Sequence, residues 1–418
     1  MNNAETKIRR TAGTGTLASL LSVGLLSAAA TYAPVSYGGA TFKIDDTKWI
    51  SIGAGIRSSF TATEGAADGK WSNDFNLDNA RIYINGQIHK YVKLEFNTEC
   101  FPCTSSQGGD VMMLDAIAKF EIMPEFNLWV GRQLVAAERR ELNGPFYSAI
   151  YNTFGGGTPF EPSDLNVRYF NDGTSAGAIG RDDGANIWGA FFEGRLQYVA
   201  GFFRGLRGGA NKDDNILYAQ RVSYNFLDVE KNPGYYTSGT YYGKGGDIFT
   251  VGVANQYQED GAGIAGDAGT FRGTSVDVLY EQNLPENMGV ITFNGEYKNY
   301  GITGFDMTSR QLVQSGAVKG FPLFEGNAFD LSLMYLMPQK VWIGQFQPYI
   351  RYTDTMPVNS TNRNLYEAGV NYIIDGHNAR VSLMYMYGDL LTKGNFNFTD
   401  TAKGDSVSQI MLGVQLQI

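Results

Sequence analysis

The sequence predicts an all-β fold, a transmembrane antiparallel up-and-down β-barrel of 16 strands with a long third loop folded into the lumen. Three observations predict it. The 418 residues include 52 Gly and 25 Tyr, and only 18% are charged, against roughly 25% in average soluble domains. Period-two alternation recurs after residue 45, whereas helical periodicity is hard to find there. The only long apolar stretch is N-terminal, which excludes a helical membrane protein.

Composition also excludes several kinds of function. Two His and two Cys leave little material for a His-based triad, a zinc site or haem attachment, so we expect no catalytic residues, no metal and no cofactor. The formal charge of −9 argues against a nucleic-acid binder, because affinity for phosphates needs an excess of cations.

The N-terminus has the pattern of a secretory signal peptide over residues 1–33. Basic residues precede a short apolar core, and cleavage after Ala30 or Ala33 fits the small residues there. A transmembrane anchor is the alternative, but the core from Leu17 to Ala30 has 14 residues, fewer than the ~20 that a span needs. We expect a short periplasmic segment over 34–48 and the barrel over 49–418, in the outer membrane of a Gram-negative-type bacterium.

The strands are longer than those of most globular proteins. Most have 9–14 residues, whereas ~5–6 is usual and ~9–11 are needed to cross a bilayer at a tilt. They are expected at 49–63, 75–88, 91–100, 111–122, 126–135, 185–193, 195–204, 214–226, 246–259, 272–281, 289–300, 326–336, 342–353, 363–374, 379–390 and 406–418.

The connections alternate between short and long if both ends of the barrel are periplasmic. Short turns such as 123–125 and 375–378 would be periplasmic, and longer loops such as 136–184 would lie outside. This alternation is typical of outer-membrane barrels. Residues 227–245 depart from it, because a long link stands where a short turn is expected; they are a long turn or a patch where a periplasmic partner docks.

Each strand has one apolar and one polar face, so outer-membrane lipid would contact the first and water the second. Trp and Tyr near strand ends, such as Trp49 and Trp342, fit interfacial girdles, with ordinary cross-strand packing as the alternative. With Asp277, Glu296 and Glu367, the inward charges are eight cations and five anions. The principal ones are Arg57, Arg81, Lys93, Glu95, Asp115, Lys119, Arg221, Lys298, Arg351 and Arg380.

The loop at 136–184 is the strongest candidate for a selectivity element. Loops of this length are usually functional or disordered, and one folded into a barrel would narrow it and present charges to passing ions. A solvated charge run on an outward loop is the alternative. The candidate constriction residues are Glu138, Arg139, Arg140, Glu141, Arg168 and Arg181.

Cys100 and Cys103, in the run Glu-Cys-Phe-Pro-Cys-Thr, are the only cysteines. In an exported protein a local disulfide that closes a loop is favoured over two free thiols or over a metal or redox role.

Three stretches resemble the phosphate-selective porin O/P family over residues 75–205. They are Phe75–Gly86 with Val92–Phe96, Leu114–Ala116 with Leu128–Gln133, and Gly194–Tyr198 with Gly201–Gly205. The resemblance implies a 16-stranded homotrimeric porin with an infolded third loop. It does not carry over a phosphate site, because the inward cations here are mixed with acids.

The leading functional interpretation is a passive porin for small hydrophilic solutes, with a slight preference for inorganic anions. A second is a barrel that serves as scaffold or sheath for a periplasmic or electron-carrying partner, or as a surface receptor or adhesin. An outer-membrane enzyme is disfavoured, because His89 and His377 are expected in periplasmic turns. A secreted soluble all-β protein is the remaining possibility.

Overall fold

The computed structural model describes residues 39–67, 69–101, 110–152, 168–169, 175–176, 180–205, 211, 213–264, 266–304, 325–358, 362–390 and 406–418. The expected signal peptide at 1–33 lies outside the described residues, so its presence and cleavage site stay predictions.

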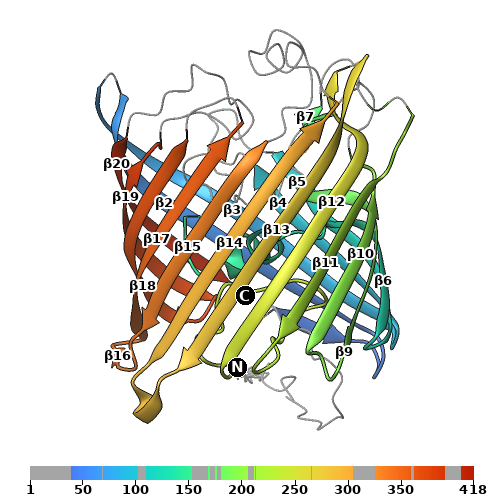
Figure 1. Ribbon diagram of the computed structural model, residues 1–418. Helices are drawn as coiled ribbons and strands as arrows, with labels where there is room; N and C mark the ends of the chain where they lie inside the picture. Colours follow the sequence, from blue (N-terminus) through green and yellow to red (C-terminus); the bar gives the residue numbers. More distant parts are fainter. Residues whose placement is uncertain are drawn as a thin grey trace, which may run out of the picture. The chain divides into compact units, whose positions relative to one another are not determined.

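Within the described residues, sixteen strands form a closed antiparallel barrel (Figure 1), which confirms the predicted fold class. Each matches one expected segment. They are β2 (Trp49–Ala67), β3 (Lys70–His89), β4 (Val92–Phe101), β5 (Asp110–Met123), β6 (Phe126–Leu134), β9 (Arg181–Phe191), β10 (Leu196–Phe203), β11 (Leu217–Asn225), β12 (Ile248–Ile264), β13 (Asp267–Asn283), β14 (Val290–Thr303), β15 (Gly326–Leu336), β17 (Gly344–Pro357), β18 (Arg363–Asp375), β19 (Ala379–Gly388) and β20 (Val407–Gln417).

The remaining elements are small. Two are short pairs, β7 (Arg168–Tyr169) with β8 (Ser175–Ala176) and β16 (Lys340–Val341) with the start of β17. A single α-helix of the described residues, α1 (Arg139–Tyr147), follows β6, and a 3-10 turn (Pro285–Asn287) joins β13 to β14. No helix in the described part of the chain is long and apolar enough to span a membrane.

The barrel closes where β2 meets β20, with Gly55 opposite Gln417. The edge of β2 beyond the end of β20 pairs with an extra strand, β1 (Ala40–Lys43), in which Ala40 lies opposite Ile52. Part of the segment expected only as a periplasmic N-terminal stretch at 34–48 therefore adds to the sheet. The reason is that β1 satisfies backbone groups of β2 that β20 does not reach.

Short connections gather at one end of the barrel, at the bottom of Figure 1, and we call this the turn end. The β2–β3 and β12–β13 hairpins extend at the opposite end, with strands continuing to Ala67 and Ile264. The stretches 64–74 and 260–271, expected as loops, are thus largely strand, because their backbone groups stay paired across each hairpin.

Side chains alternate between the two faces of the barrel as the sequence pattern indicates. On β19 and β20, Leu383, Tyr385, Leu412 and Val414 are exposed on the outside, whereas Arg380 is fully buried on the inside. An apolar exterior of this kind is what contact with lipid requires.

We expect Leu383→Lys to destabilise the barrel, because it places a charge on the lipid face halfway along β19. The free energy of unfolding, measured by urea titration in lipid vesicles, should fall by about 2–4 kcal/mol. Val341→Lys, in exposed β16 at the turn end, is the control and should cost about 0–1 kcal/mol. Equal effects of the two substitutions would contradict a lipid-facing β19.

Candidate functional site

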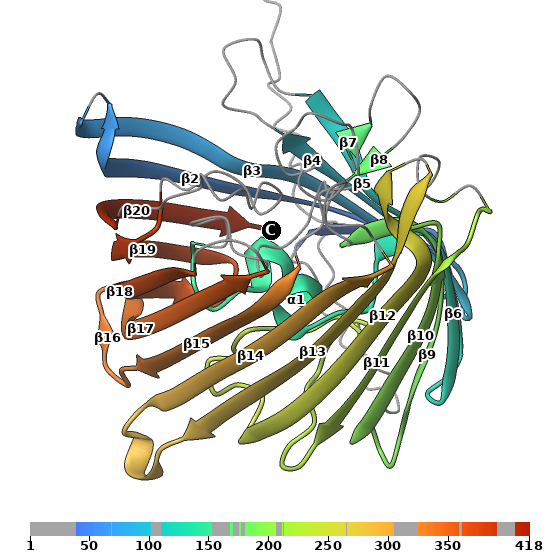
Figure 2. The ribbon, with the colours of Figure 1, turned by 45° about the horizontal axis from the view of Figure 1, so that its top comes forward.

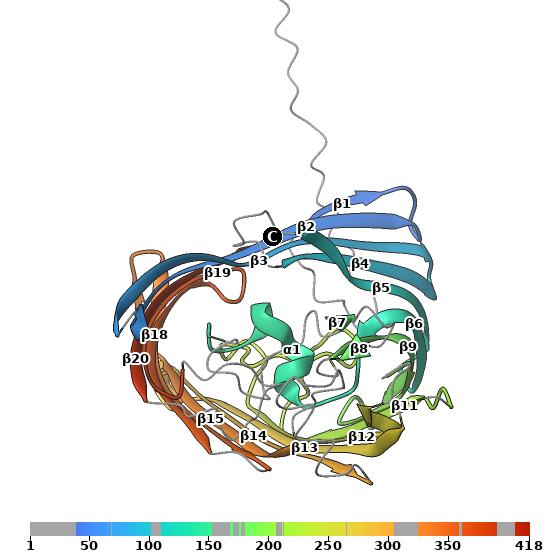
Figure 3. The same cartoon turned by 90° about the horizontal axis from the view of Figure 1, so that it is seen from above.

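The described first part of the long third loop, residues 135–152, runs through the interior of the barrel; we call it the infolded loop. Figures 2 and 3 show α1 inside the ring of strands. Nearly every residue of the infolded loop is buried, including the charged residues from Glu138 to Glu141.

Wall side chains hold the backbone of the infolded loop by donating to its carbonyl oxygens. Four of the cations expected to face a solute do this instead. The donors and acceptors are Gln256 to Ala136 (3.0 Å), Arg221 to Ala137 (3.1 Å), Gln415 to Phe146 (2.9 Å), Arg380 to Ser148 (2.8 Å) and Ala149 (3.1 Å), Arg57 to Tyr151, and Arg351 to Asn152 (2.9 Å).

Glycines on the inner wall make room for the aromatic side chains of this loop. A Cβ atom on Gly413 would come within 2.5 Å of the Tyr151 ring, and one on Gly55 within 2.8 Å of the Phe146 ring. The rings therefore lie directly against the wall. Tyr151 is further fixed by Arg57, whose guanidinium lies 4.2 Å from the ring centroid, and by donation of its hydroxyl to Asp78 (2.6 Å).

The charged residues that open the infolded loop pair with acids and bases around them. Arg139 donates to both carboxylate oxygens of Glu230 (2.8 and 2.6 Å). Arg140 forms an ion pair with Asp330 at 3.0 Å, and Glu138 forms one with Lys298 at 2.6 Å. Burial alone would raise the pKa of Glu230, but Arg139 lowers it to about 2.

Residues 226–247, between β11 and β12, also fold inward, and we call them the turn-end link. Tyr235 and Tyr236 are buried, and the Tyr235 hydroxyl donates to Leu134 O (2.7 Å). Thr237 Oγ1 donates to Arg139 O (2.7 Å), and Gly239 N donates to Tyr147 O (2.9 Å). The link is therefore neither a simple long turn nor an exposed tyrosine patch, because its tyrosines pack against the infolded loop.

His377, in the β18–β19 turn, joins the link to the infolded loop. Its Nε2 lies 2.9 Å from Thr240 O and 3.0 Å from Ser238 Oγ. The rings of Tyr147 and Tyr242 lie on either side, with centroids 5.1 and 5.0 Å from the imidazole. Burial and the nearby charge of Arg380 lower the pKa of His377 to about 3.

The interior beside β6 and β9 is largely apolar, which differs from the polar inner face expected on every strand. Trp129 on β6 and Trp188 on β9 point inward, with ring centroids 5.5 Å apart. They belong to a cluster that includes Ile117, Leu134, Leu142, Val199, Phe203, Tyr235 and Phe271. These inward apolar side chains are stable because the infolded loop and the turn-end link cover them.

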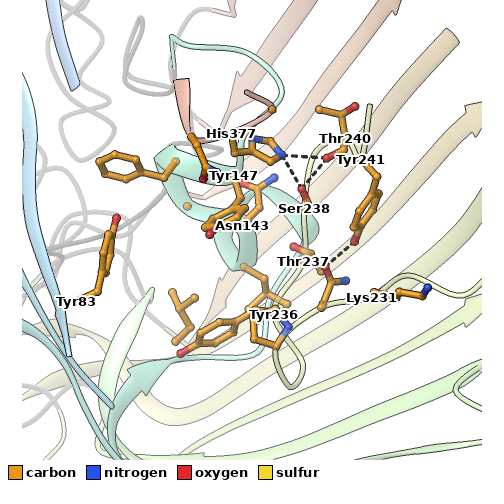
Figure 4. A pocket seen from close by; sticks show the side chains of 18 of the residues that line it. Tyr83, Asn143, Tyr147, Lys231, Tyr236, Thr237, Ser238, Thr240, Tyr241 and His377 are labelled. Atoms are coloured by element: carbon orange, nitrogen blue, oxygen red, sulfur yellow. Dashed lines mark hydrogen bonds between the residues drawn. The ribbon is translucent and has the colours of Figure 1, made fainter. Parts of the chain in front are cut away.

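A cavity of about 290 Å³ lies between the β3–β5 side of the wall and the two infolded segments (Figure 4). It reaches the turn end, where Lys231, Lys244 and Asp375 are exposed. Its lining includes Arg81, Tyr83, Glu95, Asn97 and Asp115 from the wall, Arg181 from β9, Asn143, Phe146 and Tyr147 from the infolded loop, Tyr236, Thr237 and Ser238 from the link, and His377.

The charges deep in this cavity are paired with one another or with neighbours on the wall. Arg181 donates to Asp115 at 2.8 Å. Lys119 pairs with Glu95, and Arg81 with Glu99. The cavity therefore contains charged groups but is locally close to neutral.

The sequence-predicted residues fall into two groups. All ten inward charges lie on the inner face, with Lys93 half-buried beside Glu121. Of the ten, only Arg81, Glu95 and Asp115 line the cavity. Of the six loop candidates, Arg181 lines it, Glu138–Glu141 are buried away from it, and the Arg168 side chain lies outside what the structure describes.

The sequence did not point to Glu230, Asn143 or the inward Trp129. The one available signal was the length and tyrosine content of 227–245. Among the described residues, no group of three or more His, Cys, Asp or Glu side chains is arranged to hold a metal ion. Cys100 is disulfide-bonded, but Cys103 lies outside the described residues, so the pairing of these two stays a prediction.

Comparisons with known proteins show the fold. No protein-family model matches the sequence, and neither does any curated protein. An anion-selective porin from Comamonas acidovorans is 11% identical with a TM-score of 0.54, covering 89% of this chain and 100% of that one. The Salmonella typhi OmpF complex with daunomycin is 12% identical with a TM-score of 0.53, covering 89% and 98%. The outer membrane channel DcaP of Acinetobacter baumannii is 11% identical with a TM-score of 0.50, covering 90% and 99%.

The chain thus has the fold of outer-membrane porins. The finer resemblance to the phosphate-selective porin O/P family over residues 75–205 is not shown, because no family model matches.

Glu230→Gln should destabilise the link, because it leaves the buried guanidinium of Arg139 without its bidentate partner. We expect the free energy of unfolding to fall by about 3 kcal/mol. Urea titration in lipid vesicles measures it, and Glu193→Gln, at an exposed turn position, should change little. Equal midpoints for the two variants would show that the Arg139–Glu230 pair does not hold the link.

Acid should weaken the contacts of His377. Its pKa is lower in the folded than in the unfolded protein, so its contribution to stability is complete above pH 6.5 and is lost as pH falls towards about 3. The loss is at most about 1.4 kcal/mol per pH unit. Urea midpoints at a series of pH values should fall less steeply for His377→Gln than for the wild type. The same slope in both proteins would contradict this role.

Proposed function

We propose that this protein is a passive diffusion pore for small hydrophilic solutes in the outer membrane. The observation that carries the proposal is the cavity of about 290 Å³ beside β3–β5, lined by polar and aromatic side chains, inside a barrel whose exterior is apolar. A lumen with polar groups on a lipid-embedded barrel supports movement of solutes that cannot cross lipid.

The infolded loop and the turn-end link support a narrow pore rather than an open one. Together they occupy much of the interior, and an apolar cluster fills the side near β6 and β9. We therefore expect a conductance well below that of a barrel of the same strand number with an unobstructed lumen.

The proposed preference for anions is weak. Arg57, Arg221, Arg351 and Arg380 donate to loop carbonyls, and Arg139 and Arg140 are paired with acids, so these cations offer little free charge to a solute. The exposed lysines of the cavity lining, Lys231 and Lys244, favour anions slightly over Asp375, the one exposed acid of that lining. A dedicated phosphate site has no support in these contacts.

Two other functions have less support. A sheath needs room for a partner inside the barrel, and the chain's own segments occupy that room. The Ser238–His377 pair, at 3.0 Å, suggests a nucleophile beside a base. However, Ser238 Oγ donates to Thr240 O, and Nδ1 of His377 faces the Tyr242 hydroxyl at 3.5 Å instead of a carboxylate. The pair is better explained as a structural contact.

Single-channel recording in planar bilayers tests the proposal. We expect small, ohmic steps and a reversal potential in a salt gradient that indicates only slight anion preference. The absence of conductance would overturn the pore, and firm cation preference would overturn the anion preference.

A cysteine introduced at the mouth of the cavity tests whether solutes pass through this cavity. A bulky, charged thiol reagent should lower the conductance of Lys231→Cys, because Lys231 lines the cavity. Lys340→Cys is the matched control, since Lys340 is also an exposed lysine at the turn end but lies in β16 outside the cavity. An equal response of both variants would show that solutes take another path.

A further inference from the structure

Three polar groups that line the cavity have no hydrogen-bond partner among the described residues. They are the side-chain oxygens of Asn97 and Asn143 and the hydroxyl of Tyr236. All three residues are more than nine-tenths buried, at 5%, 8% and 7% exposure. A buried polar group without a partner costs about 1–3 kcal/mol, so these groups are suited to a ligand that supplies the missing bonds.

These three groups come from different elements that face the same space. Asn97 lies on β4, Asn143 on α1 and Tyr236 on the turn-end link. Figure 4 shows Asn143 and Tyr236 across the cavity from Tyr83 on the wall. A ligand between them would be held from several sides.

Aromatic rings form the other part of the lining. Tyr83 and Phe146 meet edge to face, with ring centroids 6.2 Å apart and planes at 84°. Tyr236 adds a third ring, packed edge-on against Trp129 at 5.5 Å. Aromatic rings contact apolar C–H surfaces, and tyrosine hydroxyls contact polar ones.

The fixed charges of the cavity do not favour an ion at this depth. Arg181 with Asp115, Arg81 with Glu99, and Lys119 with Glu95 form local pairs. An ion would lose hydration without gaining an uncompensated counter-charge. An apolar solute would leave Asn97, Asn143 and Tyr236 unsatisfied. The combination fits a neutral molecule with hydroxyl groups around an apolar ring face.

We infer that the cavity is a binding site for neutral polyhydroxylated ring solutes, of the size of a monosaccharide or a cyclitol. The inference rests on the proposed pore function and names its substrate class. Hydroxyl groups of the solute donate to the oxygens of Asn97 and Asn143 and bond the Tyr236 hydroxyl, while its C–H face packs on the aromatic rings.

The test compares glucose and myo-inositol with glucuronate and glucosamine, which carry opposite charges on a similar six-membered ring. Partial block of the KCl current in planar bilayers gives the half-blocking concentration of each. The neutral pair should block at concentrations about threefold to tenfold lower than the charged pair, the range that one or two hydrogen bonds provide. Equal block by the charged pair would overturn the inference.

Tyr236→Phe removes the hydroxyl and keeps the ring. It should raise the half-blocking concentration of glucose about threefold to tenfold, with block measured as a fraction of the variant's own KCl current. Tyr366→Phe, on the outer face of the barrel, is the matched control and should match the wild type. An unchanged glucose block in Tyr236→Phe would overturn the role of the three unpartnered groups.

Measuring glucose binding to the protein in detergent distinguishes the proposed binding site from the proposed pore. Because Trp129 packs on Tyr236, glucose should change the intrinsic tryptophan fluorescence of the wild type at lower concentrations than of Tyr236→Phe. Binding without conductance would overturn the pore and keep the site. Conductance without binding or block would overturn the site and keep the pore.

Discussion

The structure depends on one constraint: every backbone donor and acceptor out of reach of water needs a partner. In lipid the sixteen strands satisfy this constraint by closing into a ring, in which one edge of β2 is hydrogen-bonded to β20 and, further along, to β1. The same requirement continues inside, where the infolded loop has few backbone partners of its own. The wall supplies them through Arg57, Arg351 and Arg380.

This use of arginine changes how the interior charges are understood. Eight inward cations on a barrel suggest an inner surface that attracts anions, and the strand pattern alone supports that prediction. Once a loop passes through the bore, guanidinium groups are good donors to its carbonyls, because each has five N–H groups in a fixed geometry. The remaining charges meet acids across the interior, as in Arg139 with Glu230.

The cavity is what the packing of two infolded segments leaves open. On the β6–β9 side, Trp129 and Trp188 pack against the turn-end link and close the space. On the β3–β5 side, Tyr83 and Phe146 meet with polar groups between the wall and α1. Glycines such as Gly55 decide how near the loop comes to the wall. The position and the chemistry of the cavity follow from the same contacts.

The sequence by itself determined the sixteen strands, their order and the inward face of the ten principal charges, because the period of two is a local property that each strand displays alone. It also identified Arg81, Glu95, Asp115 and Arg181, which line the cavity. Only the tertiary structure decided which cations are free, that residues 226–247 fold inward, and that Asn143 and Tyr236 line one cavity. These contacts join residues about a hundred positions apart, as Tyr235 with Leu134 does, and the irregular turn-end link carries no periodic pattern from which such pairing can be predicted.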